Sequence, residues 1–239
     1  MTTTLSETDG RLARIHETGF WRVMIHSTVF EERRIPTLRD CEKLVESASV
    51  RLRGWDYPHV DRDGYVRGDD FIQSGSDFGN HVELWRLYQS GQFVHRFAIR
   101  YDRTPFFSFE SNTLGGELVP SSPHIDFIDV LYTVTEILEF TKGLAYHGAL
   151  DPAGKLRIEL YGAQGRVLTS PPGRVLHGPY TAAIDTIAWS TTQPAAVLVA
   201  DAPRLAIDAT VHILERFNWP EPAPAMLEEE QRRFLERRL

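Results

Sequence analysis

Two strand-like segments joined by a tight turn constrain the fold of this chain most strongly. Residues 81–89 and 92–101 both alternate in the manner of strands, and Ser90-Gly91 separates them. A side-chain period of two is that of a β-strand, and a short glycine-containing connection is typical of a hairpin. The second segment places two sets of side chains on opposite faces: Phe93, His95, Phe97, Ile99 and Tyr101 on one, and Val94, Arg96, Ala98 and Arg100 on the other. The sequence therefore predicts an antiparallel β-hairpin.

A strand, a helix and a second strand are predicted upstream of the hairpin. Residues 21–25 alternate between apolar and more polar side chains, as in a strand with one buried face. Thr37 is a suitable N-cap for a helix over residues 38–48, whose apolar stripe includes Cys41. Residues 50–57 form the next predicted strand, which ends at Pro58. Cys41 is expected to be a buried, unreactive thiol, because no neighbouring base or cation is evident.

A long helix dominates the prediction downstream of the hairpin. Ser122 and Pro123 fit its N-cap and first position, and the helix ends at Gly143 or continues to Gly148. Further strands are predicted at residues 106–109, 155–161, 174–176 and 183–191, and a last packed helix begins at Pro203. Residues 195–200 fit either a strand or a helix.

The order of these elements favours an α+β fold with a mixed or antiparallel sheet, because helices and strands do not alternate regularly. The 239 residues are enough to bury about 70% of the chain's surface. We expect an N-terminal arm (1–18), a single domain (19–217), a proline-rich linker (218–224) and a C-terminal amphipathic helix (225–239). Two halves that meet near residue 110 are the alternative.

Composition and missing motifs narrow the possible functions. The chain has 26 Lys and Arg against 33 Asp and Glu, and its net charge of −7 argues against nucleic-acid binding. A single Cys, a polar N-terminus and the lack of a long apolar run predict a cytoplasmic protein without membrane contact. The sequence has no glycine-rich phosphate loop, nucleophile elbow or H-E-x-x-H motif. No cofactor is expected, and enzymatic activity is not favoured.

Arginines next to aromatic residues are the leading candidate for a binding site. Of the 26 basic residues only three are lysines, and several arginines fall in predicted strands. Guanidinium groups bind phosphates and carboxylates through paired hydrogen bonds and stack on aromatic rings. The predicted ligand-binding residues are Arg51, Arg53, Trp55, Arg86, Arg96 and Arg100. They would bind a small anion or a nucleotide; the alternative is an outer sheet face whose arginines pair with acidic helices.

An acidic segment gives a second candidate. Residues 56–83 contain histidines and carboxylates that alternate at short spacing, and imidazole and carboxylate are suitable ligands for a divalent cation. The candidate metal ligands are His59, Asp61, Asp63, His81 and Glu83. They would make the protein a metal-dependent hydrolase or nuclease; the alternative is a solvated loop in which Asp side chains stabilise turns.

The C-terminal helix is the best candidate for contact with a partner. Acidic residues lie in its first turns and arginines toward its end, which matches the helix dipole. Its few sizeable apolar residues, Met226, Leu227, Phe234 and Leu235, must be covered by another surface. That surface belongs either to the same domain or to another chain, including a second copy.

Residues 50–59 and 83–93, with their Gly-Trp-Asp-Tyr-Pro-His and Leu-Trp-Arg-Leu-Tyr-Gln-Ser-Gly-Gln-Phe stretches, resemble an uncharacterised bacterial domain. That domain occurs alone or fused to Schlafen-like DNA- or ATP-binding modules, and the likeness covers roughly residues 20–105. The resemblance implies a bacterial cytosolic accessory or sensor module of a multi-protein system, for which antiviral defence is one setting. It provides no functional residues. We therefore interpret the chain as a non-enzymatic binding or interaction module.

Overall fold

The computed structural model describes residues 9–61, 64–103, 123–171, 174 and 176–237. Its main feature is a seven-stranded sheet with the order β2-β3-β4-β5-β1-β7-β9, in which all neighbouring strands are antiparallel. Its strands are β1 (Phe20–Ser27), β2 (Val66–Arg67), β3 (Phe71–Asp77), β4 (Val82–Tyr88), β5 (Phe93–Ala98), β7 (Ala153–Tyr161) and β9 (Ile187–Pro194). Two short parallel strands, β6 (His124–Asp126) and β8 (Val167–Thr169), form a separate sheet. The α+β fold is confirmed.

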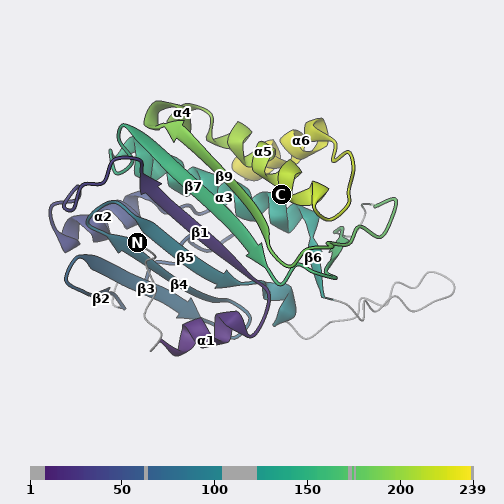
Figure 1. Ribbon diagram of the computed structural model, residues 1–239, viewed down its shortest axis with the longest axis horizontal. Coiled ribbons are helices and arrows are strands. Elements are labelled where there is room, and N and C mark those ends of the chain that lie inside the picture. The colour runs from purple at the N-terminus through teal and green to yellow at the C-terminus, as the bar shows by residue number, and fades with distance from the viewer. Residues whose placement is uncertain (1–8, 62–63, 104–122, 172–173, 175, 238–239) are drawn as a thin grey trace.

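The helices are distributed unequally over the two faces of the sheet (Figure 1). They are α1 (Gly10–His16), α2 (Leu38–Ala48), α3 (Phe127–Tyr146), α4 (Ala195–Ala200), α5 (Ala202–Glu215) and α6 (Pro224–Leu235). Helices α2 to α6 contribute to one large core on the inner face, with α3 at its centre. On the outer face α1 packs Leu12 and Ile15 against Val82, Leu84 and Val94 of β4 and β5. Among the described residues, no helix covers the outer face of β7 and β9.

The hairpin that the sequence predicts is formed by β4 and β5. Trp85 lies opposite His95, and Leu87 lies opposite Phe93, so these side chains share the inner face. Gly91 in the turn has φ 82°, a conformation that favours glycine. A Cβ at this position would also lie 2.6 Å from the carbonyl oxygen of Ala149. The turn thus needs glycine for two separate reasons.

Several other predicted elements are confirmed. Strand β1 buries Trp21, Val23 and Ile25, and Thr37 caps α2 by accepting a hydrogen bond from the backbone N–H of Asp40 at 3.1 Å. Cys41 is buried on α2, and burial raises the pKa of its thiol to about 12. Residues 195–200, for which the sequence left two possibilities, form helix α4.

Other element predictions are wrong. Residues 50–57 are a loop rather than a strand: only Val50 and Tyr57 pair, in an isolated bridge, and Gly54 between them has φ 87°. Helix α3 begins at Phe127 because the side chain of Asp126 accepts hydrogen bonds from the N–H groups of Ile128 and Asp129. Pro123 precedes the helix, and Ser122 lies outside the described residues.

The remaining strand predictions differ mainly in their boundaries. Strand β7 begins two residues before the predicted segment, and β9 begins at Ile187 and runs to Pro194. Arg174 and Leu176 are not in a strand, and residue 175 lies outside the described residues, as does the strand expected at 106–109.

Helix α6 packs on its own domain. Leu227 and Phe234 are fully buried, and the ring of Phe234 stacks on that of Tyr132 in α3 with 3.9 Å between the centroids. Nε2 of Gln231 donates to Oγ1 of Thr135 at 3.1 Å. Of the four predicted interface residues, Met226 and Leu235 remain half-buried, but Leu227 and Phe234 are already covered by this chain. The apolar face of the helix is therefore not an open partner surface.

No helix among the described residues is both long enough and apolar enough to cross a lipid bilayer.

Candidate ligand-binding site

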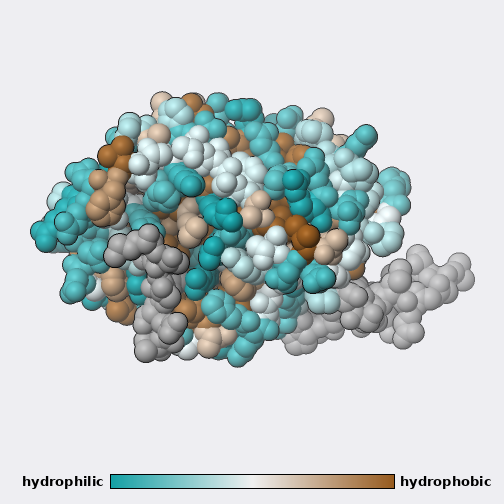
Figure 2. Space-filling model, viewed as in Figure 1, coloured by the Kyte–Doolittle hydropathy of each residue, from teal (hydrophilic) through white to brown (hydrophobic). Residues whose placement is uncertain are grey.

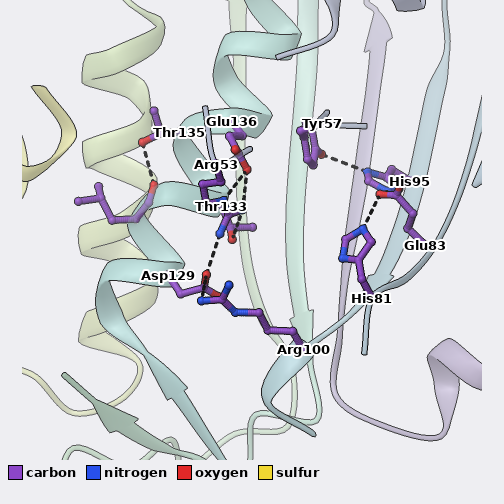
Figure 3. A network of polar contacts seen from close by, with 11 residues as sticks. Arg53, Tyr57, His81, Glu83, His95, Arg100, Asp129, Thr133, Thr135 and Glu136 are labelled. Atoms are coloured by element: carbon purple, nitrogen blue, oxygen red, sulfur yellow. Dashed lines mark hydrogen bonds and ion pairs between the residues drawn. The ribbon is translucent and has the colours of Figure 1, made fainter. Parts of the chain in front are cut away.

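A group of polar side chains lies at one end of the inner sheet face, where four segments meet (Figure 3). The loop of residues 50–59, the β3–β4 turn, the end of β5 and the first turns of α3 each contribute to it. Strands β4 and β5 position Glu83 and His95, because both side chains occupy inward positions of the hairpin. The site is therefore built on the element that the sequence predicts best.

Glu83 is the centre of the first half of this group. One carboxylate oxygen, Oε2, lies 3.0 Å from Nε2 of His95 and 3.5 Å from Nε2 of His81. The other, Oε1, accepts the backbone N–H of His59 at 2.7 Å. Burial opposes ionisation of Glu83, but its contacts with the two histidines outweigh it and lower the pKa of this carboxyl. Glu83 is therefore an ionised carboxylate inside the protein.

His95 connects Glu83 to a tyrosine. Its Nδ1 lies 3.2 Å from the hydroxyl of Tyr57, and its side chain has no solvent exposure. Burial lowers the pKa of His95, even though its contact with Glu83 opposes this shift. A neutral imidazole with its proton on Nε2 satisfies both contacts, because it donates to Glu83 and accepts from Tyr57. This histidine is a buried core residue whose two ring nitrogens both have partners.

Arg53 is the centre of the second half. Its Nη2 lies 2.5 Å from Oε2 of Glu136, and its Nη1 donates to Oδ1 of Asp129 at 2.7 Å. Thr133 accepts a further hydrogen bond from Nη2. Burial raises the pKa of Glu136, while the charge of Arg53 limits that rise. Burial also acts against the charged form of Arg53, but the two carboxylates outweigh it and raise its pKa.

The outer part of the site is an aromatic pocket of about 330 Å³. It is lined by Trp55, His59, Phe78, Asn80, His81 and Arg100. Trp55 and Phe78 are 41% and 65% exposed, which is unusual for such large apolar side chains. Behind the pocket, a cavity of about 40 Å³ shares Trp55, His81 and Arg100 with it. The inner cavity has room for a water molecule or two, so a larger ligand fits only in the outer pocket.

The six predicted ligand-binding residues do not form one surface. Arg53, Trp55 and Arg100 meet at the pocket, where the guanidinium of Arg53 lies 5.6 Å from the ring centroid of Trp55. Arg51 points into solvent and pairs with Asp56. Arg86 and Arg96 occupy outward positions of β4 and β5, on the other side of the sheet. The prediction is wrong on this point, because residues 50–57 are not a strand that continues the hairpin face.

The four predicted metal ligands that the structure describes, His59, Asp61, His81 and Glu83, are not assembled as a metal site. Within the described residues, no group of three or more His, Cys, Asp or Glu side chains is placed to hold a metal ion. Glu83 instead accepts hydrogen bonds from its neighbours, and His59 contacts it through the backbone N–H. Asp63 lies outside the described residues.

Three site residues from α3 were missed by the sequence analysis. Asp129, Thr133 and Glu136 are spaced by four and three residues, so they form a polar stripe on a helix that is otherwise mainly buried and apolar. That spacing is visible in the sequence and was the available signal. Phe78, which follows β3, gave no comparable signal.

Comparisons with known protein families, with curated proteins and with solved structures find no match to this chain. The likeness of residues 50–59 and 83–93 to an uncharacterised bacterial domain remains a prediction. The two segments do meet in space: the indole N–H of Trp85 donates to the carbonyl oxygen of His59 at 2.8 Å. The two segments are therefore in contact, and the first of them contributes Trp55 and His59 to the aromatic pocket.

Proposed function

We propose that this protein is a non-enzymatic binding module and that the aromatic pocket binds a planar ring carrying an anionic group, such as a nucleotide. The observation that carries the proposal is the pair of exposed rings, Trp55 and Phe78, on the wall of one pocket. Two exposed aromatic faces in a concave site suit a planar ligand, because ring stacking excludes water from both partners.

The volume and polar groups of the pocket support a small ligand. About 330 Å³ lies at the lower end of the range of roughly 300–1,000 Å³ for small-molecule sites. His59, His81 and Asn80 provide side-chain hydrogen-bonding groups at the wall, where they can orient a heteroaromatic ring. The side chain of Arg100, which is 40% exposed, provides a positive charge. A ring with an attached phosphate fits the volume of the pocket, can be oriented by its hydrogen-bonding groups and is attracted by the charge of Arg100.

The state of the ionisable groups favours binding over catalysis. Glu83, His95, Arg53 and Glu136 hold one another in place through hydrogen bonds and ion pairs, and they are largely buried. Such groups support the wall of a pocket rather than reach a substrate. The proposed role as an accessory or sensor module of a bacterial multi-protein system comes from the resemblance of residues 50–59 and 83–93, and a ligand site without chemistry suits such a role.

A calorimetric titration with adenosine, inorganic phosphate and nucleoside 5′-phosphates tests the proposal. We expect the nucleoside phosphates to bind more tightly than either fragment. Trp55→Ala should weaken binding by about 1–3 kcal/mol, roughly 5- to 150-fold, because it removes a stacking surface. Trp55→Phe should restore most of the affinity, since a ring remains.

Phe30→Ala is the matched control for Phe78→Ala. Phe30 is 80% exposed and does not line this pocket, so its loss should leave binding unchanged, whereas Phe78→Ala should weaken it. The proposal fails if no nucleoside phosphate binds the unmodified protein, if phosphate alone binds as tightly, or if Phe30→Ala and Phe78→Ala behave alike.

A further inference from the structure

The outer face of the sheet is a second surface, separate from the aromatic pocket. Helix α1 covers β4 and β5 on this side, but among the described residues no helix lies over β7 and β9. Figure 1 looks onto this face, and Figure 2 shows hydrophilic side chains there, interspersed with smaller hydrophobic areas. A sheet face that no described helix covers is common in antiparallel sheets, so the feature that distinguishes this face is its charge.

The charges on this face are mainly positive. Outward positions of β1, β5 and β7 place Arg22 opposite Arg96 on one side and Glu159 on the other, with Arg157 and Lys155 further along β7. Glu159 is the one carboxylate at the outward positions of β1, β5, β7 and β9. Its two oxygens contact Nε of Arg22 at 2.5 Å and Nε of Arg157 at 2.9 Å. One carboxylate thus serves two arginines, and positive charge remains.

Arg96 shows this excess most directly. It makes no ion pair with any described residue, and its Nε is buried without a hydrogen-bond partner there. Burial, followed by the nearby charge of Arg22, lowers its pKa. Its charge also acts on His16 of α1, whose pKa is lowered first by burial and then by Arg96. A bound anion would relieve these unfavourable interactions, because guanidinium groups donate paired hydrogen bonds to phosphate or carboxylate oxygens.

Aromatic rings border the same arginines. Phe20 and Tyr161 stack with 4.6 Å between their centroids, His16 lies 4.8 Å from Phe20, and the guanidinium of Arg22 lies 5.4 Å from the Tyr161 ring centroid. Arginines combined with aromatic rings on the face of an antiparallel sheet are one arrangement with which proteins bind single-stranded nucleic acids.

The positive charge of this face disfavours contact with a second copy of the chain and favours a polyanion. A second copy docked through the same surface would bring like charges together, which disfavours association. Cations on adjacent strands lie about 5 Å apart and those on diagonal positions about 7–8 Å apart. An extended chain of phosphates can contact several of them at once.

From this charge complementarity we propose that the outer face around Arg22, Arg96, Arg157 and Lys155 binds the phosphate backbone of a single-stranded nucleic acid. The net charge of −7, which makes such binding unexpected from composition, is a property of the whole chain. Binding depends on the local field, which at the outward positions of β1, β5 and β7 comes from four cations and one carboxylate. This proposal is independent of the aromatic pocket, since the residues of the two sites lie on opposite sides of the sheet.

Fluorescence anisotropy of a labelled thymidine oligonucleotide, measured over a series of salt concentrations, tests the proposal. With three to four phosphate contacts, the logarithm of affinity should fall with the logarithm of salt with a slope of about −2 to −3. Arg96→Gln combined with Lys155→Gln should make this slope shallower by about 1.4, since each lost contact removes about 0.7. Adding Arg157→Gln to this double variant should make the slope shallower by about a further 0.7.

Arg204→Gln combined with Arg232→Gln is the matched control. It removes the same total charge from exposed positions on α5 and α6, helices on the inner side, so the slope should not change. The proposal is overturned if the oligonucleotide does not bind at low salt, or if the control lowers the slope as much as the outer-face variant. It is also overturned if polyglutamate binds as tightly as the oligonucleotide, since an acidic protein would then be the better partner. Circular dichroism of each variant verifies that it folds.

Discussion

Removing Arg53 should reveal how strongly the stability of the protein depends on the cation that pairs with Glu136 and Asp129. The change is Arg53→Met, which keeps an unbranched apolar side chain but leaves Glu136 without its countercharge. Glu136 has no solvent exposure, and Arg53 contacts it through both Nε and Nη2, at 3.1 and 2.5 Å. Both contacts are to Oε2, and Oε1 of Glu136 has no hydrogen-bond partner among the described residues. The isolated carboxyl would therefore have to remain charged in an apolar setting or take up a proton.

The magnitude follows from this burial. Removal of one partner of a buried ion pair typically costs about 3–5 kcal/mol of unfolding free energy. For a chain of this size that corresponds to a fall in Tm of about 6–20 °C, at roughly 2–4 °C per kcal/mol. Arg51→Met is the matched control, because Arg51 lies two residues away, is 67% exposed and pairs with Asp56. Loss of an exposed pair costs about 0.2–1 kcal/mol.

The destabilisation should depend on pH in a defined direction. Burial already raises the pKa of Glu136 above its value in the unfolded chain, and loss of Arg53 raises it further. A carboxyl with a raised pKa in the folded state favours folding at low pH, and this contribution is lost as pH rises through the folded-state pKa. Urea denaturation should therefore show a smaller difference between Arg53→Met and the unmodified protein at about pH 5 than at about pH 8.

A double variant completes the test. Arg53→Met with Glu136→Leu removes both partners, so it should be more stable than Arg53→Met alone at neutral pH. Asp129 keeps Arg100, which lies 3.0 Å from its Oδ1. The reasoning is refuted if Arg53→Met costs no more than Arg51→Met, or if its cost does not change with pH.

Two further predictions concern helix ends and the C-terminus. Burial raises the pKa of Asp126, the N-cap of α3, to about 6, so its stabilising contribution is lost as pH rises through that value. Asp126→Asn keeps a capping side chain, and its stability relative to the unmodified protein should therefore increase between about pH 4 and pH 7; parallel stability curves would contradict this. Phe234→Ala should cost about 3–5 kcal/mol because the ring is fully buried against this chain, whereas Arg233→Ala on the exposed side of α6 should cost under about 1 kcal/mol. Light scattering should give the same mass for both variants, and a change of mass with Phe234→Ala would point instead to contact between chains.

The parts of the fold that were predictable are those set by local rules. The hairpin follows from alternation and a glycine turn, and the start of α2 follows from Thr37. The wrong start of α3 has a local cause as well: Ser122 and Pro123 match the cap pattern, but Asp126 makes the actual hydrogen bonds to Ile128 and Asp129. Residues 124–126 pair instead with β8, which begins more than 40 residues later, and no local pattern indicates that pairing.

The candidate site was predictable only in part, for the same reason. Trp55, His81 and Arg100 were identified from the sequence, but as members of two different sites. They meet because the loop of residues 50–59 folds back over the hairpin, with the carbonyl oxygen of His59 held by Trp85. The metal prediction grouped His59, His81 and Glu83 because of their spacing. The structure brings their backbones and side chains close, but it uses Glu83 as a hydrogen-bond acceptor.

Side chains alternate between the two faces of a sheet along each strand, and this alternation explains why arginines with similar sequence surroundings lie in different environments. Arg22 and Arg96 lie on the outer face because their neighbours Trp21, Val23, His95 and Phe97 are inward, and this alternation is visible in the sequence. Arg53 belongs to a loop, so this alternation does not assign its side chain to either face of the sheet. Its setting is fixed by Asp129 and Glu136, which follow it by 76 and 83 residues. A strand arginine can thus be assigned to a sheet face from sequence alone. The carboxylates that surround the loop residue Arg53 come from a helix that is distant in the sequence, so they could not be predicted in this way. Arg22 and Arg96 accordingly lie on the face turned away from α3, the helix that supplies the carboxylates around Arg53.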